Sequence, residues 1–178
     1  MYNKFVEFEI SVLDSLDAVR NELMDCVNLF LSSLADRGLI WILAGVILLF
    51  FSKTRKIGFC VLLALLVNFI LVNLAVKPLV ARVRPYDINT SVRIILDAPH
   101  DFSFPSGHTS ASFAAAVAIL LKNRRWGVAA VVLATLIGFS RLYLYVHFPT
   151  DVICGALFGI ISALTASYAV SKFTAVLR

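Results

Sequence analysis

The stretch Ser140-Arg141-Leu-Tyr-Leu-Tyr-Val-His147-Phe-Pro-Thr-Asp151 places a cation, an imidazole and a carboxylate in a chain that holds few polar groups. His147 stands six residues after Arg141 and four before Asp151. Asp151 can therefore fold back onto one ring nitrogen of His147 and leave the other nitrogen facing a substrate that Arg141 holds. The spacing indicates a catalytic site at the end of an apolar run.

Two further blocks of the sequence share this logic. Lys77 precedes Arg84-Pro85 in one block, and Pro105-Ser106-Gly107-His108 forms the other. Each block lies at the end of an apolar run, where a helix would deliver it to a membrane surface. The three blocks are therefore expected to face the same surface.

The composition is that of an integral membrane protein. Of the 178 residues 60% are hydrophobic and only 15% are charged, against about 25% charged in soluble proteins. The net charge of +5 is not gathered into one basic patch with interleaved aromatics, so no nucleic-acid partner is predicted. Cys26, Cys60 and Cys154 are widely spaced and predict free, buried thiols.

The apolar runs predict a single all-α domain over residues 1–178, a polytopic bundle of transmembrane helices. Residues 1–36 mix apolar and acidic residues and predict an amphipathic segment at the membrane surface, ahead of a core at 39–170. Five spans are predicted and a sixth is left open: 39–51, 57–76, 109–121, 126–146 and 150–170. The alternative first span runs from about residue 27 to 51 and buries Asp36 and Arg37, which is costly.

Particular residues mark these spans. Trp41 is expected to anchor the first span at the interface. Asn68 and Asn73 are expected to face other helices, and Lys77-Pro78 is expected to end the second span.

Basic stretches predict the orientation. Residues 53–56, 122–125 and 172–178 hold eight Lys or Arg and no acid, and alternate spans put all three stretches on one side. By the positive-inside rule that side is the cytoplasm. The chain is therefore expected to be a multi-pass protein of the cytoplasmic (inner) membrane, with the three blocks on the outer face.

Three cations with no acid near them in the sequence, Lys77, Arg84 and Arg141, lie at the ends of the second and fourth predicted spans. Three clustered positive charges beside a low-dielectric wall form a site for a multiply charged anion, commonly phosphate. Each cation alone fits an ordinary snorkelling residue at a helix end. The spacing of all three blocks favours the phosphate site.

Residues 105–108 open the third predicted span. Gly107 permits close backbone approach, and the free amides at a helix start bind phosphate oxygens. The Ser106 hydroxyl either joins them or serves as an N-cap, and the sequence alone favours the cap. His108 would then stand beside the bound phosphoryl group.

Two histidines that flank one phosphate suggest a division of labour. His147, paired with Asp151, would attack phosphorus, while His108 would protonate the departing oxygen and later activate water. Lys and Arg at the site would repel a divalent ion, so no metal or other cofactor is predicted. His100 lies outside the three blocks and is expected to be a solvated loop residue.

Together the three blocks resemble the tripartite signature of the type II phosphatidic acid phosphatase (PAP2) family, over residues 77–151. The resemblance assigns phosphate binding to five residues: Lys77, Arg84, Ser106, Gly107 and Arg141. It assigns catalysis to three: His108 as the acid, His147 as the nucleophile and Asp151 as the residue that orients it. It also implies a helix bundle, metal-free catalysis and, in bacteria, a site on the outer face of the membrane.

The function expected from this is a lipid phosphate or pyrophosphate phosphohydrolase that acts through a phosphohistidine. Undecaprenyl pyrophosphate is the first expected substrate, and phosphatidylglycerophosphate or phosphatidic acid the second. A lipid phosphotransferase and a non-enzymatic membrane scaffold are the alternatives from other classes. The expected partners are the lipid substrate and the bilayer, and the sequence leaves the oligomeric state open.

Overall fold

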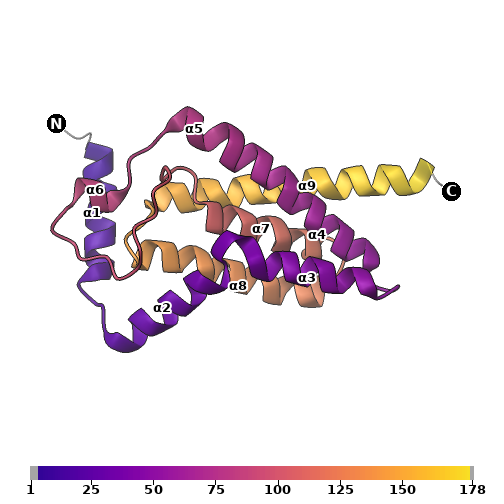
Figure 1. Ribbon diagram of the computed structural model, residues 1–178, viewed down its shortest axis with the longest axis horizontal. Helices are drawn as coiled ribbons and strands as arrows, with labels where there is room; N and C mark the ends of the chain where they lie inside the picture. Colours follow the sequence, from indigo (N-terminus) through magenta and orange to yellow (C-terminus); the bar gives the residue numbers. More distant parts are fainter. Residues whose placement is uncertain (1–3, 177–178) are drawn as a thin grey trace.

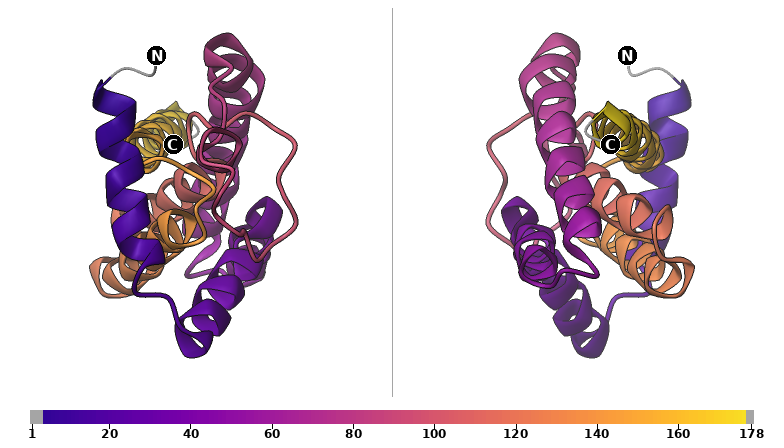
Figure 2. Two further views of the ribbon diagram at one scale, coloured as in Figure 1. Left: turned by 90° about the vertical axis from the view of Figure 1, so that its left-hand side faces the viewer. Right: turned by 90° about the vertical axis from the view of Figure 1, so that its right-hand side faces the viewer.

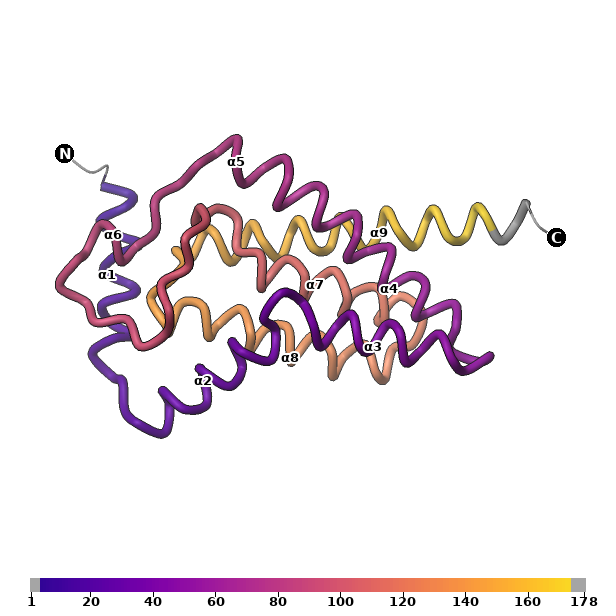
Figure 3. Tube along the Cα trace, in the orientation of Figure 1, coloured from indigo at the N-terminus to yellow at the C-terminus, as the bar shows by residue number. Residues whose placement is uncertain are grey.

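The computed structural model describes residues 4–176, with side chains to residue 173, and every regular element in that range is a helix (Figures 1 and 3). In chain order the elements are α1 (Lys4–Asp17), α2 (Glu22–Leu34), η1 (Asp36–Gly38), α3 (Leu39–Phe50), α4 (Arg55–Asn68), η2 (Phe69–Val76), α5 (Lys77–Val80), α6 (Pro85–Ile88), α7 (Gly107–Leu120), α8 (Arg124–Tyr143) and α9 (Pro149–Val176). The predicted all-α fold is confirmed.

Side-chain caps mark where several helices begin. Asn21, Ser106 and Asn123 precede α2, α7 and α8, and each side chain accepts a hydrogen bond from a first-turn amide. Such caps satisfy amides that have no partner inside the helix. The N-cap role that the sequence favours for Ser106 is therefore present in the structure.

The long helices run along one axis, and α1 crosses one end of the bundle roughly at a right angle to them (Figures 1 and 2). The central helix is α7, which packs against both α8 and α9 and also contacts α4. Four alanines on α7 have no exposed surface: Ala114, Ala115, Ala116 and Ala118.

Glycines on α9 set how closely it approaches α7. A β-carbon added at Gly155 would lie 2.8 Å from the carbonyl oxygen of Ser106. One added at Gly159 would lie 2.4 Å from the carbonyl oxygen of Ser110. Small residues four apart allow this backbone contact between helices, as in membrane proteins generally.

Length and hydropathy identify three segments that are able to cross a membrane: Arg55–Ile88, Arg124–Tyr143 and Pro149–Phe173. The pair Glu22–Leu34 and Asp36–Phe50, bent by 41°, would add a fourth if it forms one span. The 14 residues of α7 cover only about 21 Å, against about 30 Å of bilayer core. The chain is thus a multi-pass membrane protein with three or four spans identified by these criteria.

The bend between α2 and α3 explains how the chain accommodates two charges. Arg37 and Gly38 adopt left-handed backbone conformations, with φ of 51° and 70°, and interrupt the helix. Asp36 and Arg37 are both exposed at this bend. The charges that made a straight span over residues 27–51 costly therefore lie outside the packed interior.

The second predicted span does not end at Lys77-Pro78 as expected. The helix continues through η2, which is a π-helix, and α5 to Val80, and Ala81 ends it in a left-handed conformation with φ of 48°. Asn68 does face a neighbouring helix, because it is 2% exposed and its amide lies 3.2 Å from the Ser110 hydroxyl.

The expectation that Trp41 anchors the protein at the membrane interface is wrong. Its side chain is 3% exposed, and its indole nitrogen donates a hydrogen bond of 2.9 Å to the hydroxyl of Ser112 on α7. A tryptophan satisfies its single donor at an interface or inside the protein, and here α7 supplies the acceptor. The prediction of buried thiols fails for Cys26, which is exposed.

The helix directions separate two ends of the bundle. The α4–α5 segment ends at the first sequence block, α7 begins at the second, and α8 ends and α9 begins at the third. The basic residues 53–56 and 122–125 therefore lie at the opposite end, as does the C-terminal part of α9 (Figure 1). Arg178, the last residue of the third basic stretch, lies outside the described residues.

Replacing Gly159 with Ala should destabilise the fold by about 1–3 kcal/mol, because the added methyl group overpacks the α7–α9 contact. The measurement is the thermal unfolding midpoint in detergent. Leu157→Ala is the control, since Leu157 is 54% exposed on the same helix and its loss should change the midpoint little. A midpoint unchanged by Gly159→Ala would contradict the close approach of these helices.

Candidate active site

The three sequence blocks meet at one end of the bundle. Four of their basic side chains are buried in the described structure: Lys77 (7% exposed), Arg84 (3%), Arg141 (2%) and His147 (2%). A guanidinium nitrogen of Arg84 lies 3.5 Å from Nε2 of His147, which joins the first block to the third. A β-carbon added at Gly107 would lie 3.9 Å from Nζ of Lys77, which joins the first block to the second.

His147 and Asp151 form the pair that their spacing predicts. The link after α8 carries His147, and Asp151 lies in the first turn of α9. Nδ1 of His147 lies 3.6 Å from Oδ2 of Asp151, and Nε2 faces Arg84. One ring nitrogen thus faces the carboxylate and the other faces a phosphate-binding candidate.

The environment of His147 keeps its imidazole neutral. Burial, together with the positive charges of Arg84 and Arg141, lowers the pKa of His147 to about 4, although the neighbouring Asp151 carboxylate opposes this shift. At neutral pH the ring therefore keeps an unprotonated nitrogen. That lone pair is what a nucleophile requires.

A carboxylate that the sequence analysis missed bridges two of the three cations. The Asp101 side chain accepts hydrogen bonds from Lys77 and from Arg84, the latter at 2.6 Å, and its carbonyl accepts another from Arg84 at 2.8 Å. No acid is near these cations in the sequence, and the fold brings Asp101 to two of them from 17 and 24 residues away. Burial alone would raise the pKa of Asp101, but its contacts with Lys77 and Arg84 lower it to about 2, so it stays ionised.

Arg141 has a different environment. It is 2% exposed and donates to the hydroxyl of Ser32 on α2, and its Nε has no hydrogen-bond partner within residues 4–173. A buried guanidinium is costly without an anion. Arg141 therefore keeps a donor and a positive charge for an anionic ligand.

The start of α7 supplies backbone donors beside these cations. Oγ of Ser106 accepts from the Thr109 amide at 3.4 Å, and the Ser106 amide donates to the carbonyl of Asp151 at 3.0 Å. The amides of Gly107 and His108 remain at the open helix start, where anions bind.

His108 is the second residue of α7, and an acidic side chain, Asp36, lies near it. Nε2 of His108 lies 3.9 Å from a carboxylate oxygen of Asp36, which comes from the bend between α2 and α3. His100 is exposed on the loop before α7, in agreement with the sequence.

The structure brings together all eight residues that the sequence selects: Lys77, Arg84, Ser106, Gly107, His108, Arg141, His147 and Asp151. Their catalytic and binding roles stay predictions. Sequence reasoning missed Asp101 and also Ser103, whose hydroxyl donates to Asp151 at 2.5 Å, although both lie just before the second block. It also missed Ser32 and Asp36, for which no local signal exists because they are distant in the sequence.

No group of three His, Cys, Asp or Glu side chains suited to a metal ion occurs in the described part of the chain. The prediction that the site needs no metal stays a prediction.

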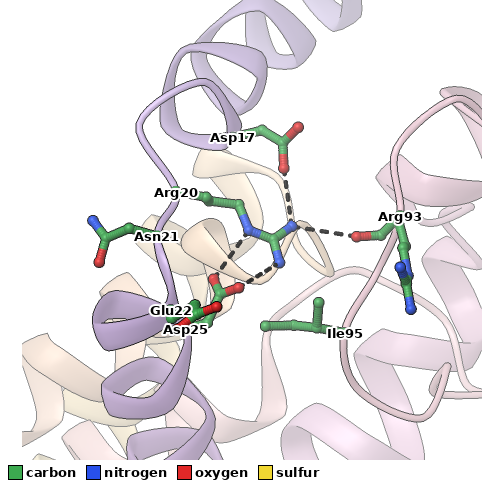
Figure 4. A pocket seen from close by; sticks show the side chains of 7 residues that line it. All are labelled: Asp17, Arg20, Asn21, Glu22, Asp25, Arg93 and Ile95. Atoms are coloured by element: carbon green, nitrogen blue, oxygen red, sulfur yellow. Dashed lines mark hydrogen bonds and ion pairs between the residues drawn. The ribbon is translucent and has the colours of Figure 1, made fainter.

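A hollow lies between the α1–α2 link and the loop before α7 (Figure 4). Arg20 points into it and pairs with Asp17 at 2.9 Å and Asp25 at 3.1 Å. The same guanidinium donates to the carbonyl of Arg93 at 3.3 Å. Two acids already neutralise Arg20, so it offers no free positive charge to an anion. Its contacts instead hold the α1–α2 link, α2 and the loop before α7 together.

Comparison with known proteins identifies relatives of the chain. The sequence profile of the PAP2 superfamily matches residues 54–175. Undecaprenyl-diphosphatase of Sulfolobus acidocaldarius is 34% identical over 124 residues, which cover 69% of this chain but only 60% of that protein. Undecaprenyl-diphosphatase BcrC of Bacillus subtilis is 28% identical over 162 residues, which cover 89% of this chain and 79% of that protein.

A solved structure shares the fold. The crystal structure of Aquifex aeolicus LpxE matches with a TM-score of 0.77 and 27% sequence identity, covering 88% of this chain and 92% of that one. The helix arrangement described above is therefore found in an experimentally determined relative.

Replacing Asp101 with Asn should tighten the binding of inorganic phosphate about tenfold, because a competing negative charge at Lys77 and Arg84 is removed. Isothermal titration calorimetry in detergent measures the change. Asp97→Asn is the matched control, since Asp97 is exposed on the same loop and the same charge is lost. Weaker phosphate binding by Asp101→Asn would instead mean that Asp101 is needed to hold the two cations in place.

Proposed function

The chain belongs to the PAP2 superfamily, and from this premise we propose that it is a membrane phosphatase that removes a phosphate from a lipid phosphate or lipid diphosphate. The observation that carries the proposal is the buried, neutral His147, with Asp151 at one ring nitrogen and Arg84 at the other. A nucleophile oriented by an acid and directed at an anion-binding cation fits attack on a phosphoryl group.

In the first proposed step Nε2 of His147 attacks phosphorus and forms a P–N bond. The bond breaks between phosphorus and the leaving oxygen, which is the lipid oxygen of a phosphomonoester or the bridging oxygen of a diphosphate. His108 gives that oxygen a proton. Because burial and the charge of Arg141 lower the pKa of His108 to about 2 when no phosphate is bound, His108 holds this proton only when the negative charge of the bound phosphate offsets those effects. Asp151 stabilises the positive charge that the His147 ring gains. The phosphoryl oxygens are held by one set of donors: Lys77, Arg84, Ser106, Gly107 and Arg141.

In the second step water attacks the phosphohistidine. His108, now neutral, takes a proton from the water, the P–N bond breaks, and the electron pair returns to Nε2 of His147. Inorganic phosphate leaves, and both histidines regain their starting protonation states. The cycle needs no group beyond the protein's own side chains and water.

Undecaprenyl diphosphate is the first proposed substrate, because two relatives carry the name undecaprenyl-diphosphatase. Phosphatidylglycerophosphate and phosphatidic acid are the second. The charges fit either class, since Lys77, Arg84 and Arg141 together exceed the single charge of Asp101 and leave an excess for a multiply charged phosphate.

Phosphate release by purified protein in detergent tests the proposal on a panel of these three lipids, with and without EDTA. We expect release that survives EDTA. Loss of activity in EDTA that magnesium restores would contradict the metal-free mechanism. Release that depends on an acceptor lipid would indicate a phosphotransferase, and no release from any lipid would favour a scaffold.

The proposed architecture is a single domain over residues 1–178 with five spans and α1 at the membrane surface. Exposed Phe5 (52%) and Phe8 (64%) support an interfacial α1. The short α7 would cross the membrane inside a sheath of longer helices. The acid-free basic stretches support an active site on the outer face of the cytoplasmic membrane.

Substitution of the two histidines separates their roles. His147→Ala should abolish phosphoenzyme formation from every substrate, because the covalent route is lost. His108→Ala should cost about a hundredfold or more with phosphatidic acid, whose alkoxide needs a proton, yet still form phosphohistidine from nitrophenyl phosphate. Acid-quenched burst kinetics measures both. A phosphoenzyme in His147→Ala, or equal losses for both substrates in His108→Ala, would refute these roles.

Cysteine labelling tests the orientation. In a variant without Cys26, Cys60 and Cys154, His100→Cys should react with an impermeant maleimide added to intact cells, and Asn123→Cys should not. The two positions lie at opposite ends of the bundle. The reverse pattern would move the active site to the cytoplasmic face.

A further inference from the structure

We propose that Glu9 and Arg82 are positioning residues that hold the Asp151 carboxylate in the orientation that His147 requires. The inference rests on the proposed function and goes beyond it. It makes α1, which lies outside the region matched by the family profile, a working part of the active site.

Arg82 contacts the start of α9 directly. Its Nη1 donates to Oδ1 of Asp151 at 2.6 Å and to the hydroxyl of Thr150 at 2.7 Å. The guanidinium also lies 3.8 Å from the ring centroid of Phe148, a cation–π contact. Arg82 is therefore fixed against the residues on both sides of the α9 N-terminus.

Glu9 completes the arrangement from α1. One of its carboxylate oxygens accepts from Nη2 of Arg82 at 2.5 Å, and the other accepts from the amide of Thr150 at 3.0 Å and from its hydroxyl at 2.6 Å. Glu9 is 1% exposed. Burying a carboxylate is costly because it loses its hydration. The contacts of Glu9 with Arg82 and Thr150 offset this cost.

The two oxygens of Asp151 have separate partners. Oδ1 accepts from Arg82, while Oδ2 accepts from the Ser103 hydroxyl at 2.5 Å and the Phe148 amide at 2.9 Å. Oδ2 is also the oxygen that faces Nδ1 of His147. By holding Oδ1, Arg82 fixes the rotation of the carboxylate and so presents Oδ2 to the imidazole.

This placement predicts an effect on the rate of chemistry without an effect on anion binding. Among the described side chains, neither Glu9 nor Arg82 forms a hydrogen bond or ion pair with Lys77, Arg84 or Arg141. A residue that only stabilised the fold would lower the unfolding midpoint and weaken anion binding together with the rate.

The test measures three quantities for Arg82→Gln, Arg82→Lys and Glu9→Gln in full-length protein in detergent: the rate of phosphohistidine formation from nitrophenyl phosphate, the affinity for inorganic phosphate, and the unfolding midpoint. Arg82→Gln should slow phosphohistidine formation about a hundredfold, with the affinity for inorganic phosphate unchanged. Arg82→Lys should recover part of the rate. Glu9→Gln keeps an acceptor for Thr150 but loses the charge, and should show a smaller loss.

Matched controls carry the same chemical changes elsewhere. Glu7→Gln lies on the exposed side of α1, and Arg93→Gln lies on the exposed loop, so both should keep the wild-type rate. In an Asp151→Asn background, Arg82→Gln should add no further loss, because Arg82 acts through Asp151.

Three outcomes would overturn the inference. They are wild-type rates in Arg82→Gln and Glu9→Gln, a fall in the affinity for inorganic phosphate parallel to the rate, or additive losses from Arg82→Gln and Asp151→Asn. If Arg82→Gln does not fold, Arg82→Lys and Glu9→Gln are judged by the same criteria. Failure of the proposed function is distinguishable, because the wild type would then form no phosphohistidine.

Discussion

The burial of Asp151 is the constraint on which the rest of the structure depends. Its side chain has no exposed surface, and a buried carboxylate is tolerated only when charged and hydrogen-bonding partners surround it. Arg82 and Ser103 supply side-chain partners, and Phe148 supplies an amide. The backbone carbonyl of Asp151 also accepts from Ser106, so the second block is held against the third. Satisfying one carboxylate thus assembles the loop, α7 and α9 around His147.

The cations show how such a site stays stable without a ligand. Lys77 and Arg84 share the Asp101 carboxylate, which limits their mutual repulsion. Arg141 donates to the Ser32 hydroxyl, and its Nε has no hydrogen-bond partner among the described side chains. The site therefore divides into a neutralised half and a half with excess positive charge. A phosphate that enters the site would be attracted by the guanidinium of Arg141 and repelled by the carboxylate of Asp101.

Close packing around α7 gives this charged end a rigid support. Because Gly155 and Gly159 allow α9 to touch the α7 backbone, the His147–Asp151 segment is held against the α7 N-terminus. The short α7 packs along the longer helices α8 and α9. Precision at the site thus derives from backbone contacts, which are less adaptable than contacts between long side chains.

Local features of the sequence determined what depends on near neighbours in the chain. Apolar runs predicted the helices, Ser106 was recognised as an N-cap, and the four-residue spacing of His147 and Asp151 predicted their pairing. The apolar runs and basic stretches predicted that the three blocks face one surface, and the resemblance to a known signature predicted that they form one site. The first inferences depend on contacts within one or two helical turns. The last depends on a family signature whose residues are known to lie together.

Tertiary structure alone decided which distant groups meet. Glu9 is one of several acids on α1, and nothing in its neighbourhood distinguishes it from exposed Glu7; only the docking of α1 against α9 buries it beside Arg82. Trp41 has the local pattern of an interface anchor, yet Ser112 on α7 offers its donor a partner. Charge and hydrogen-bonding capacity are visible in a sequence, but the partner that satisfies them is selected by packing between remote segments.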